Sequence, residues 1–280
     1  MTAHAQPQRT GRPPRRPQRN TTAWSESLAI QRRVIGALLM REIVTRYGRH
    51  NLGFMWLFLE PMLFTLGITA LWAATKAVHG SNLPIVAFAV TGYSSVLMWR
   101  NCAGRCASAI GPNEALMCHR NVRVFDLFAS RILLEIAGAS MSLTGLAAVF
   151  MAVGWMDMPS DLLLMLTGWL LLAWFGVAMG LFVGGLAAQS ELVDRLWHTV
   201  TYLLFPLSGA GTMVDWLPRA AQDVVLWLPM VHGVEMLRHG YYGGLVRTYE
   251  SPGYLIAANV VMTVAGLALT KLIPRTGESA

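Results

Sequence analysis

The feature that most constrains this chain is a series of apolar runs, each close to the length that a membrane-spanning helix needs. The runs cover residues 52–75, 84–100, 128–153, 162–188, 192–208 and 254–273. A helix crosses the hydrocarbon core with about 20 residues, and only 13% of this chain is charged, against about a quarter of a soluble domain. We therefore predict an all-α, polytopic membrane protein with six transmembrane helices in a domain at 52–273.

Basic residues set the orientation of these helices. Ten of the 22 Lys and Arg residues precede the first apolar run, which places the amino end in the cytoplasm. Six crossings then return the tail at 274–280 to the cytoplasm as well. The tail at 1–23 is rich in Pro and Arg and is predicted to be disordered. Beside a membrane span, its charge favours attraction to lipid headgroups over nucleic-acid binding.

A first helix is predicted within 24–51, before the apolar runs. Its side chains at Trp24, Leu28, Ile35, Leu38 and Leu39 share one helical face. We expect an amphipathic helix that lies in the cytoplasmic interface of the membrane. A helix that packs on another subunit is the alternative.

The segment LWLPMVHGVEMLRHGYYGG at 226–244 is too polar to cross lipid and too apolar for an exposed loop. Before Pro229, a helical face carrying Asp215, Arg219 and Asp223 is expected to form an ion-paired stripe, and a second helix is expected at about 232–242. Neither helix is long enough to span. We predict two short re-entrant helices in the outer leaflet, within about 212–245, that line or cap a passage, because non-helical backbone at that depth needs protein or water around it.

Ionisable residues of this segment are the candidates for an outer gate. His232, Glu235 and His239 share one helical face, an arrangement compatible with a metal site, but a fourth ligand and the zincin spacing are missing. The favoured interpretation is that Glu235 pairs with Arg238 or His239, and we predict no metal site. The gate candidates are Arg219, His232, Glu235, Arg238, His239 and Tyr242.

Within the apolar runs, four residues are candidates for lining a polymer corridor: Trp56, Glu60, Tyr93 and Trp99. An ionisable group inside a span is a functional candidate, although a paired, structural carboxylate beside Pro61 is equally compatible with Glu60. Aromatic rings can stack on sugars, although most serve packing or the interfacial belt.

Two groups of small residues complete the analysis of the spans. Gly176, Gly180 and Gly184 permit close approach of a second helix, from the same chain or from a second copy. Cys102, Cys106 and Cys118 are expected to form neither a disulfide nor a metal site.

The sequence contains no G-x-x-x-x-G-K-[ST] motif, so it does not predict a nucleotide-binding P-loop in this chain. Nor do its two halves repeat each other as they do in many secondary transporters. Transport against a gradient would therefore draw its energy from a partner.

Two separated stretches resemble the polysaccharide-exporting permeases of the ABC-2 type. The first, LLMREIVTRYGRHNLGFMWLFLEPM at 38–62, is similar to the opening signature of that family, and FPLSGAGTMVDWLPRAAQDVVLWLPMVHGVEMLRHGYYG at 205–243 is similar to its closing module. The short chain and the HGVEMLRHGYYG string are most similar to capsular polysaccharide exporters of the bacterial inner membrane. O-antigen and teichoic-acid permeases are close alternatives.

The resemblance implies a homodimer with a dimer of ATP-binding-cassette subunits, which would bind the ATP and Mg, so no cofactor is expected in this chain. It also implies a lipid-linked polysaccharide as substrate and a periplasmic co-polymerase or export adaptor as partner. A coupling helix is implied between the second and third spans, at about 113–121. Its candidate contacts are Asn113, Glu114, Leu116, Met117 and Arg120.

Independent features of 113–121 fit such a helix, with Asn113 as its N-cap, although an ordinary loop helix is the alternative. Two other functions stay open. One is a membrane-embedded, metal-dependent enzyme that modifies glycans, which would use His232, Glu235 and His239. The other is an ABC-2 exporter of drugs or lipids, against which the motif at 41–61 argues.

Overall fold

The computed structural model describes residues 24–47, 51–75, 83–117 and 122–273, and every regular element among them is helical. The tails predicted at 1–23 and 274–280 lie outside this range. The main helices are α1 (Trp24–Tyr47), α2 (Asn51–Thr75), α3 (Ile85–Ala107), α5 (Val124–Val153), α6 (Leu162–Ala187), α7 (Glu191–Leu207) and α10 (Pro252–Lys271). Shorter elements are η1 (Gly111–Asn113), α4 (Glu114–Met117), η2 (Val214–Trp216), α8 (Arg219–Val225), α9 (Pro229–Tyr242) and η3 (Gly243–Leu245).

All six apolar runs form helices, and their observed bounds lie close to the predicted ones, except that α3 extends well past residue 100. Among the described residues, α5, α6 and α10 are each long and apolar enough to cross a membrane, and Met62–Trp72 of α2 is a shorter apolar stretch. The all-helical class is therefore confirmed. The number of six crossings stays a prediction.

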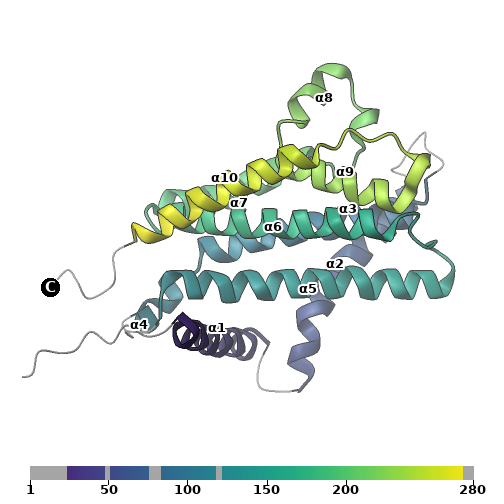
Figure 1. The fold of residues 1–280 in the computed structure, drawn as a ribbon. Helices are drawn as coiled ribbons and strands as arrows, with labels where there is room; N and C mark the ends of the chain where they lie inside the picture. Colours follow the sequence, from purple (N-terminus) through teal and green to yellow (C-terminus); the bar gives the residue numbers. More distant parts are fainter. Residues whose placement is uncertain (1–23, 48–50, 76–82, 118–121, 274–280) are drawn as a thin grey trace, which may run out of the picture.

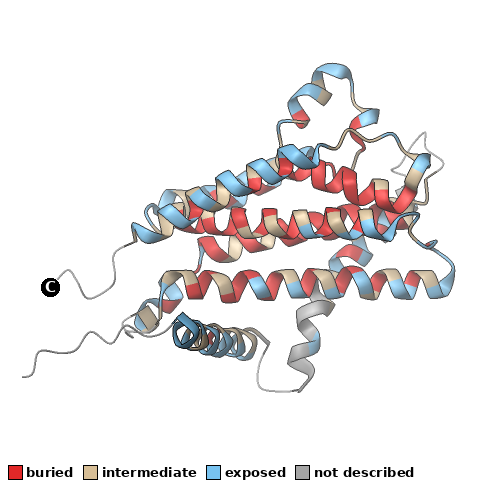
Figure 2. Cartoon of the chain, in the orientation of Figure 1, coloured by how far each residue is buried: buried red, intermediate tan, exposed pale blue. Residues whose placement is uncertain are grey.

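The helices α3 and α6 form the centre of the bundle. Helix α6 packs against α3, α9 and α10, while α5 packs against α3. Buried residues concentrate along these central helices, whereas α10 and the outer side of α5 are largely exposed (Figure 2). Because the exposed faces of α5 and α10 are apolar, they are suited to lipid.

The helices α1 and α2 and the short helix α8 depart from the common direction of the bundle, and α2 crosses α5 steeply (Figure 1). The helix α1 is seen nearly end-on beneath α5, so its axis crosses the bundle at the end that carries α4. It packs on α5 and α2, with Leu38 buried and Trp24 exposed. The short α8 projects away from the bundle on the opposite side.

The glycine stripe of α6 packs within the same chain. A Cβ at Gly176 would lie 3.3 Å from Cys102 Sγ, and a Cβ at Gly184 would lie 2.8 Å from Cys106 Cβ. At Gly180 the nearest atom is a side-chain carbon of Ile132 at 3.0 Å. The sequence left open which helix approaches this stripe, and the structure shows that α3 and α5 of the same chain do so. Cys102 and Cys106 are buried, free thiols in that interface.

The segment between α7 and α10 contains two short helices, as predicted, but its first half differs in detail. Pro229 is the first residue of α9, a position where its missing N–H and fixed φ are favourable. This helix ends at Tyr242, and the next residue, Gly243, has a φ of +56°, which favours glycine. Asp215 lies in η2, and Pro218 separates it from α8. The expected stripe of Asp215, Arg219 and Asp223 on one helical face is therefore wrong.

The α3–α6 contact generates a stability prediction. Gly184→Ala places a methyl group against Cys106 Cβ, an atom fixed by the α3 backbone, so we expect a loss of about 1–3 kcal/mol from overpacking. The matched control is Gly145→Ala in α5, where a Cβ meets no atom within 4 Å. Thermal unfolding in detergent should show a lower midpoint for Gly184→Ala alone. Equal midpoints for the two variants would show that the α3–α6 contact tolerates the extra methyl group.

Candidate functional site

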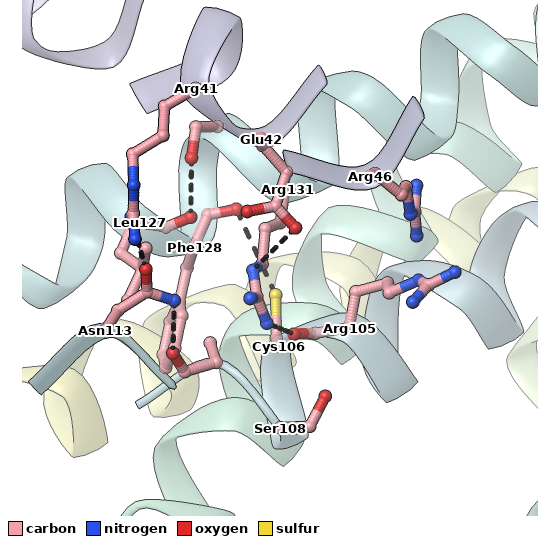
Figure 3. Close-up of polar contacts among 12 residues, drawn as sticks. Arg41, Glu42, Arg46, Arg105, Cys106, Ser108, Asn113, Leu127, Phe128 and Arg131 are labelled. Carbon is pink, nitrogen blue, oxygen red and sulfur yellow. Dashed lines mark hydrogen bonds and ion pairs between the residues drawn. The ribbon is translucent and has the colours of Figure 1, made fainter. Parts of the chain in front are cut away.

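The connection from α3 to α5 begins with η1 and α4, at the site predicted for the coupling helix. Asn113 is buried in η1, where its Oδ1 accepts a hydrogen bond from Arg41 Nη1 at 2.5 Å (Figure 3). Its Nδ2 donates to the carbonyl of Ala109 at 2.9 Å. The sequence predicted Asn113 as the N-cap of the coupling helix. In the structure its side chain instead joins this connection to α1 and to the residues that follow α3.

The other predicted contact residues lie on the short helix itself. Glu114 is exposed, and Leu116 and Met117 are partly buried. Arg120 lies outside the described residues. The side chains of α4 are thus accessible at one end of the bundle, which is the same end at which α10 finishes (Figure 1).

Beside this connection, charged side chains of α1, α3 and α5 form an ion-pair network. Glu42 of α1 lies 3.3 Å from Arg131 of α5, and Glu135 of α5 lies 2.6 Å from Arg46 of α1. Glu135 also lies 3.4 Å from Arg105 of α3. These five residues define the α1–α3–α5 junction, most of which Figure 3 shows.

The junction is mostly buried. Arg131 and Glu135 each have a relative exposure of 8%. Arg131 Nη1 also donates to the carbonyl of Arg105 at 2.6 Å, so the guanidinium holds two helices at once. A second polar link runs from Gln31 Nε2 to Asp126 Oδ1 at 3.1 Å. Because buried charges are costly to leave unpaired, α1 is held in register with α3 and α5.

At the other end, the polar face of α9 binds loop backbone. Glu235 is fully buried, and its two carboxylate oxygens accept hydrogen bonds from the backbone N–H groups of Val214 at 3.2 Å and Tyr249 at 3.3 Å. No ion pair joins it to Arg238 or His239 among the described residues. The expected local pairing is wrong because the carboxylate is held by the segments on both sides of α9.

His232 bridges the same two segments. Its Nδ1 lies 3.1 Å from the backbone nitrogen of Ser251, which donates to it, and its Nε2 lies 2.9 Å from the carbonyl of Leu226. This pattern fits the neutral tautomer with the proton on Nε2. Both ring nitrogens are therefore occupied. No group of three His, Cys, Asp or Glu residues suited to a metal ion occurs in the described part of the chain.

Arg238 is fully buried and donates to backbone carbonyls of the turn after α7. Its guanidinium reaches the carbonyl oxygens of Gly209 at 2.5 Å, Ala210 at 2.5 Å and Thr212 at 3.1 Å. The guanidinium carbon also lies 3.7 Å from the ring centroid of Phe88 in α3, a close cation–π contact. The charge is thus compensated by carbonyl dipoles and an aromatic face.

His239 pairs with a carboxylate that sequence analysis missed. Its Nδ1 lies 2.5 Å from Glu250 Oε1 in the segment before α10. Burial alone would raise the pKa of Glu250, but hydrogen bonds from Thr248 and His239 outweigh it and hold that pKa below its ordinary value. The pair fastens the end of α9 to the chain that follows it.

The remaining outer candidates lie apart from one another. Tyr242 is buried, and its hydroxyl donates to the carbonyl of Pro84 at 3.1 Å, next to the start of α3. Arg219 is exposed on the projecting α8. The structure therefore buries four of the six gate candidates, His232, Glu235, Arg238 and Tyr242, along α9, each bonded to a different backbone segment, rather than placing them on an open rim.

The corridor candidates also separate. Tyr93 is buried and meets Phe205 of α7 edge-on, with ring centroids 6.1 Å apart. Trp99 has no exposed surface and packs against Phe175 of α6, so its ring is closed off from solvent in this chain. The side chains of Trp56 and Glu60 lie outside the described residues, although the α2 backbone is helical through both positions.

Sequence analysis missed three residues that lie against side chains of α9: Gly92 and Phe88 beside Arg238, and Glu250 beside His239. A Cβ at Gly92 would lie 2.3 Å from the Ala210 carbonyl oxygen and 2.5 Å from Arg238 Nη2. The glycine within the second apolar run is the one sequence signal for this close approach. Phe88 is one of many apolar residues in the run at 84–100, and Glu250 lies beyond the helix predicted at about 232–242. Neither residue therefore showed in the sequence that it contacts α9.

Together, the bundle and its connections define an all-helical membrane protein with a polar junction at one end and, at the other, a segment around α9 that is held by side-chain hydrogen bonds. Residues 33–242 match the ABC-2 type transporter family. The chain therefore belongs to that family, and the resemblance found in its two sequence motifs is confirmed.

The curated relatives span nearly the same length. The capsule polysaccharide export inner-membrane protein CtrC of Neisseria meningitidis serogroup B is 50% identical over 248 residues, 89% of this chain and 94% of CtrC. The Haemophilus influenzae protein of the same description, BexB, is 47% identical over 250 residues, with the same shares covered. The Escherichia coli polysialic acid transport protein KpsM is 28% identical over 251 residues, 86% of this chain and 93% of KpsM.

The junction generates a second prediction. Glu42→Gln leaves Arg131 as a buried, unpaired cation, and we expect a loss of about 3–5 kcal/mol of stability. The control is Glu191→Gln, which breaks an exposed pair with Arg195 and should cost no more than about 1 kcal/mol. Unfolding midpoints of the purified variants compare the two. Similar midpoints would mean that the Glu42–Arg131 pair does not hold α1 in place.

Proposed function

We propose that this chain is the membrane-spanning permease subunit of an ABC transporter that exports a lipid-linked capsular polysaccharide across the inner membrane. The observation that carries the proposal is the identity of about half of all aligned residues to CtrC and BexB, over nearly their whole length. The connection at η1 and α4, anchored to α1, supplies a surface on which a cytoplasmic partner can act.

The proposed topology has six crossings, formed by α2, α3, α5, α6, α7 and α10, with both chain ends in the cytoplasm. It is supported by the common direction of most of these helices and by the apolar surfaces of α5 and α10. In this topology α8 and α9 occupy the outer half of the membrane as re-entrant helices. The hydrogen bonds of Glu235 and Arg238 support this placement, since they satisfy non-helical backbone that lipid would leave unpaired.

The proposed assembly contains two copies of this chain and two ATP-hydrolysing subunits, which bind the ATP and Mg. Large apolar residues on α2 and α7 support a second copy, because both helices expose several of them among the side chains that the structure describes. Examples are Leu63, Phe64 and Leu71 on α2 and Leu196, Tyr202 and Leu203 on α7. A corridor for the polymer would open between two such faces, and a periplasmic adaptor would receive the chain.

In the proposed cycle, closure of the ATP-binding subunits pushes on α4. Asn113 transmits the displacement to Arg41, and the α1–α3–α5 junction carries it into the bundle. Because the ion pairs join three helices, these helices move as one unit. This unit is the element through which ATP binding would act on the corridor.

Deletion in the host tests the function directly. We expect surface polysaccharide to disappear while polymer accumulates inside the cell, and plasmid-borne re-expression to restore the surface. Affinity purification of the chain in mild detergent should also recover a stoichiometric ATPase with a P-loop. Normal surface polysaccharide in the deletion strain would refute the proposal, and recovery of the chain without any ATPase would refute the proposed assembly.

The coupling route generates a further prediction. Arg41→Ala removes the link between α1 and Asn113, a charge-assisted hydrogen bond worth about 1.5–3 kcal/mol. We expect export to fall severalfold while ATP hydrolysis by the assembled complex continues, because nucleotide is bound elsewhere. Arg33→Ala, an exposed site on the same helix, is the control. Equal export by the two variants, at equal amounts in the membrane, would rule out this route.

A further inference from the structure

A cavity of about 690 Å³ opens between the start of α5 and the end of α10, at the end of the bundle that carries α4. Its apolar lining includes Met117 of α4, Phe125 of α5 and Leu267 of α10. The exposed Leu272 extends this apolar lining at the end of α10. The volume falls within the range of sites that enclose small molecules, about 300–1,000 Å³.

The polar lining of this cavity is cationic. Arg123 and Lys271 both contribute to it, and none of the described residues that line it is Asp or Glu. Neither cation forms an ion pair among the described residues. Both side chains are exposed, which leaves their charges available to a ligand.

The carboxylate closest in sequence is already bonded. Asp126 is buried, and its Oδ2 accepts a hydrogen bond from the backbone N–H of Arg123 at 3.1 Å. Its Oδ1 accepts from Gln31 Nε2 at 3.1 Å. The carboxylate is therefore bonded to the α5 N-terminus and to α1, while neither Arg123 nor Lys271 has an ion-pair partner in the described part of the chain.

We propose that this cavity binds the headgroup of an anionic phospholipid from the surrounding bilayer. The phosphate would lie between Arg123 and Lys271, since guanidinium and ammonium groups are the usual partners of phosphate oxygens. Acyl chains would follow the apolar wall at Leu267 and Leu272, so one molecule satisfies both halves of the lining. A zwitterionic lipid would fit this site less well, because its headgroup would bring a cation close to the two basic side chains.

The site adjoins the proposed coupling element, because Met117 of α4 is part of its wall. A bound lipid would therefore fill the space between the end of α10 and α4 and restrict how α4 moves. The inference depends on the proposed function only for assigning the cavity to the cytoplasmic leaflet. Binding itself is measured without transport or ATP.

The test uses the full-length chain, purified with its associated subunits into nanodiscs of equimolar phosphatidylglycerol and phosphatidylcholine. Native mass spectrometry then counts the lipids that stay bound after release from the disc. We expect phosphatidylglycerol to be retained by the wild type and lost by the variant Arg123→Gln/Lys271→Gln. Each charge should contribute about a fivefold change in retention. Arg32→Gln/Arg33→Gln removes the same charge from the exposed face of α1 and is the matched control.

Three outcomes would overturn the proposal: equal retention by the two double variants, equal retention of phosphatidylcholine and phosphatidylglycerol, and retention that occurs only in protein from polymer-producing cells. The last would identify the anchor of the exported glycan, rather than a bilayer lipid, as the occupant. A second variant, Thr270→Trp, keeps both charges but fills the cavity, and it should also lose the lipid. If the complex binds phosphatidylglycerol as expected but exports no polysaccharide, the proposed function is refuted and the lipid site is supported.

Discussion

The structure depends on one constraint: buried backbone that leaves a helix must find hydrogen-bond partners within the protein. Around α9, ionisable side chains provide those partners. Arg238 donates to three carbonyls of the turn after α7, and Glu235 accepts from the backbone on both sides of α9. His232 adds a third bridge. The polar side chains of α9, in an otherwise apolar segment, are therefore explained by their hydrogen bonds to the backbone of the neighbouring loops.

This arrangement changes the chemistry assigned to that face. A metal ion or a catalytic proton transfer needs ring nitrogens and carboxylate oxygens that are free to meet a ligand. The two nitrogens of His232 and the two oxygens of Glu235 are all bonded to backbone. These residues are suited to fixing the shape of the segment around α9, and the alternative of a glycan-modifying enzyme loses the groups on which it relied.

The sequence predicted the helices well because their signals are local. Apolar length predicted the long helices, and Gly243 marked the end of α9. Pro229 was expected to end the preceding helix, with the next one starting at about His232, but it is the first residue of α9. The sequence failed where a side chain binds something distant along the chain. Spacing of three or four residues suggested that Glu235 pairs within α9, whereas its partners lie 21 and 14 residues away. The same limit applies to Asn113, whose local pattern indicated an N-cap while its partner Arg41 lies 72 residues away. Trp99 was proposed for a corridor because apolarity alone does not distinguish a central helix from one that faces a passage.

The two polar regions are joined by a single helix. Phe88, which lies under the guanidinium of Arg238, and Arg105, which pairs with Glu135, are both in α3, about five helical turns apart. Over its second half, α3 packs closely on the glycine face of α6, because atoms of Trp99, Cys102 and Cys106 lie 2.8–3.5 Å from the positions that Cβ atoms at Gly176 and Gly184 would occupy. A close-packed helix of this kind moves as a unit, since its interfaces do not deform continuously. A tilt imposed on α3 at the α1–α3–α5 junction would therefore reach the carbonyl turn held by Arg238. In the proposed cycle, this is how an event at the ATP-binding subunits would open the outer segment without any contact between the two.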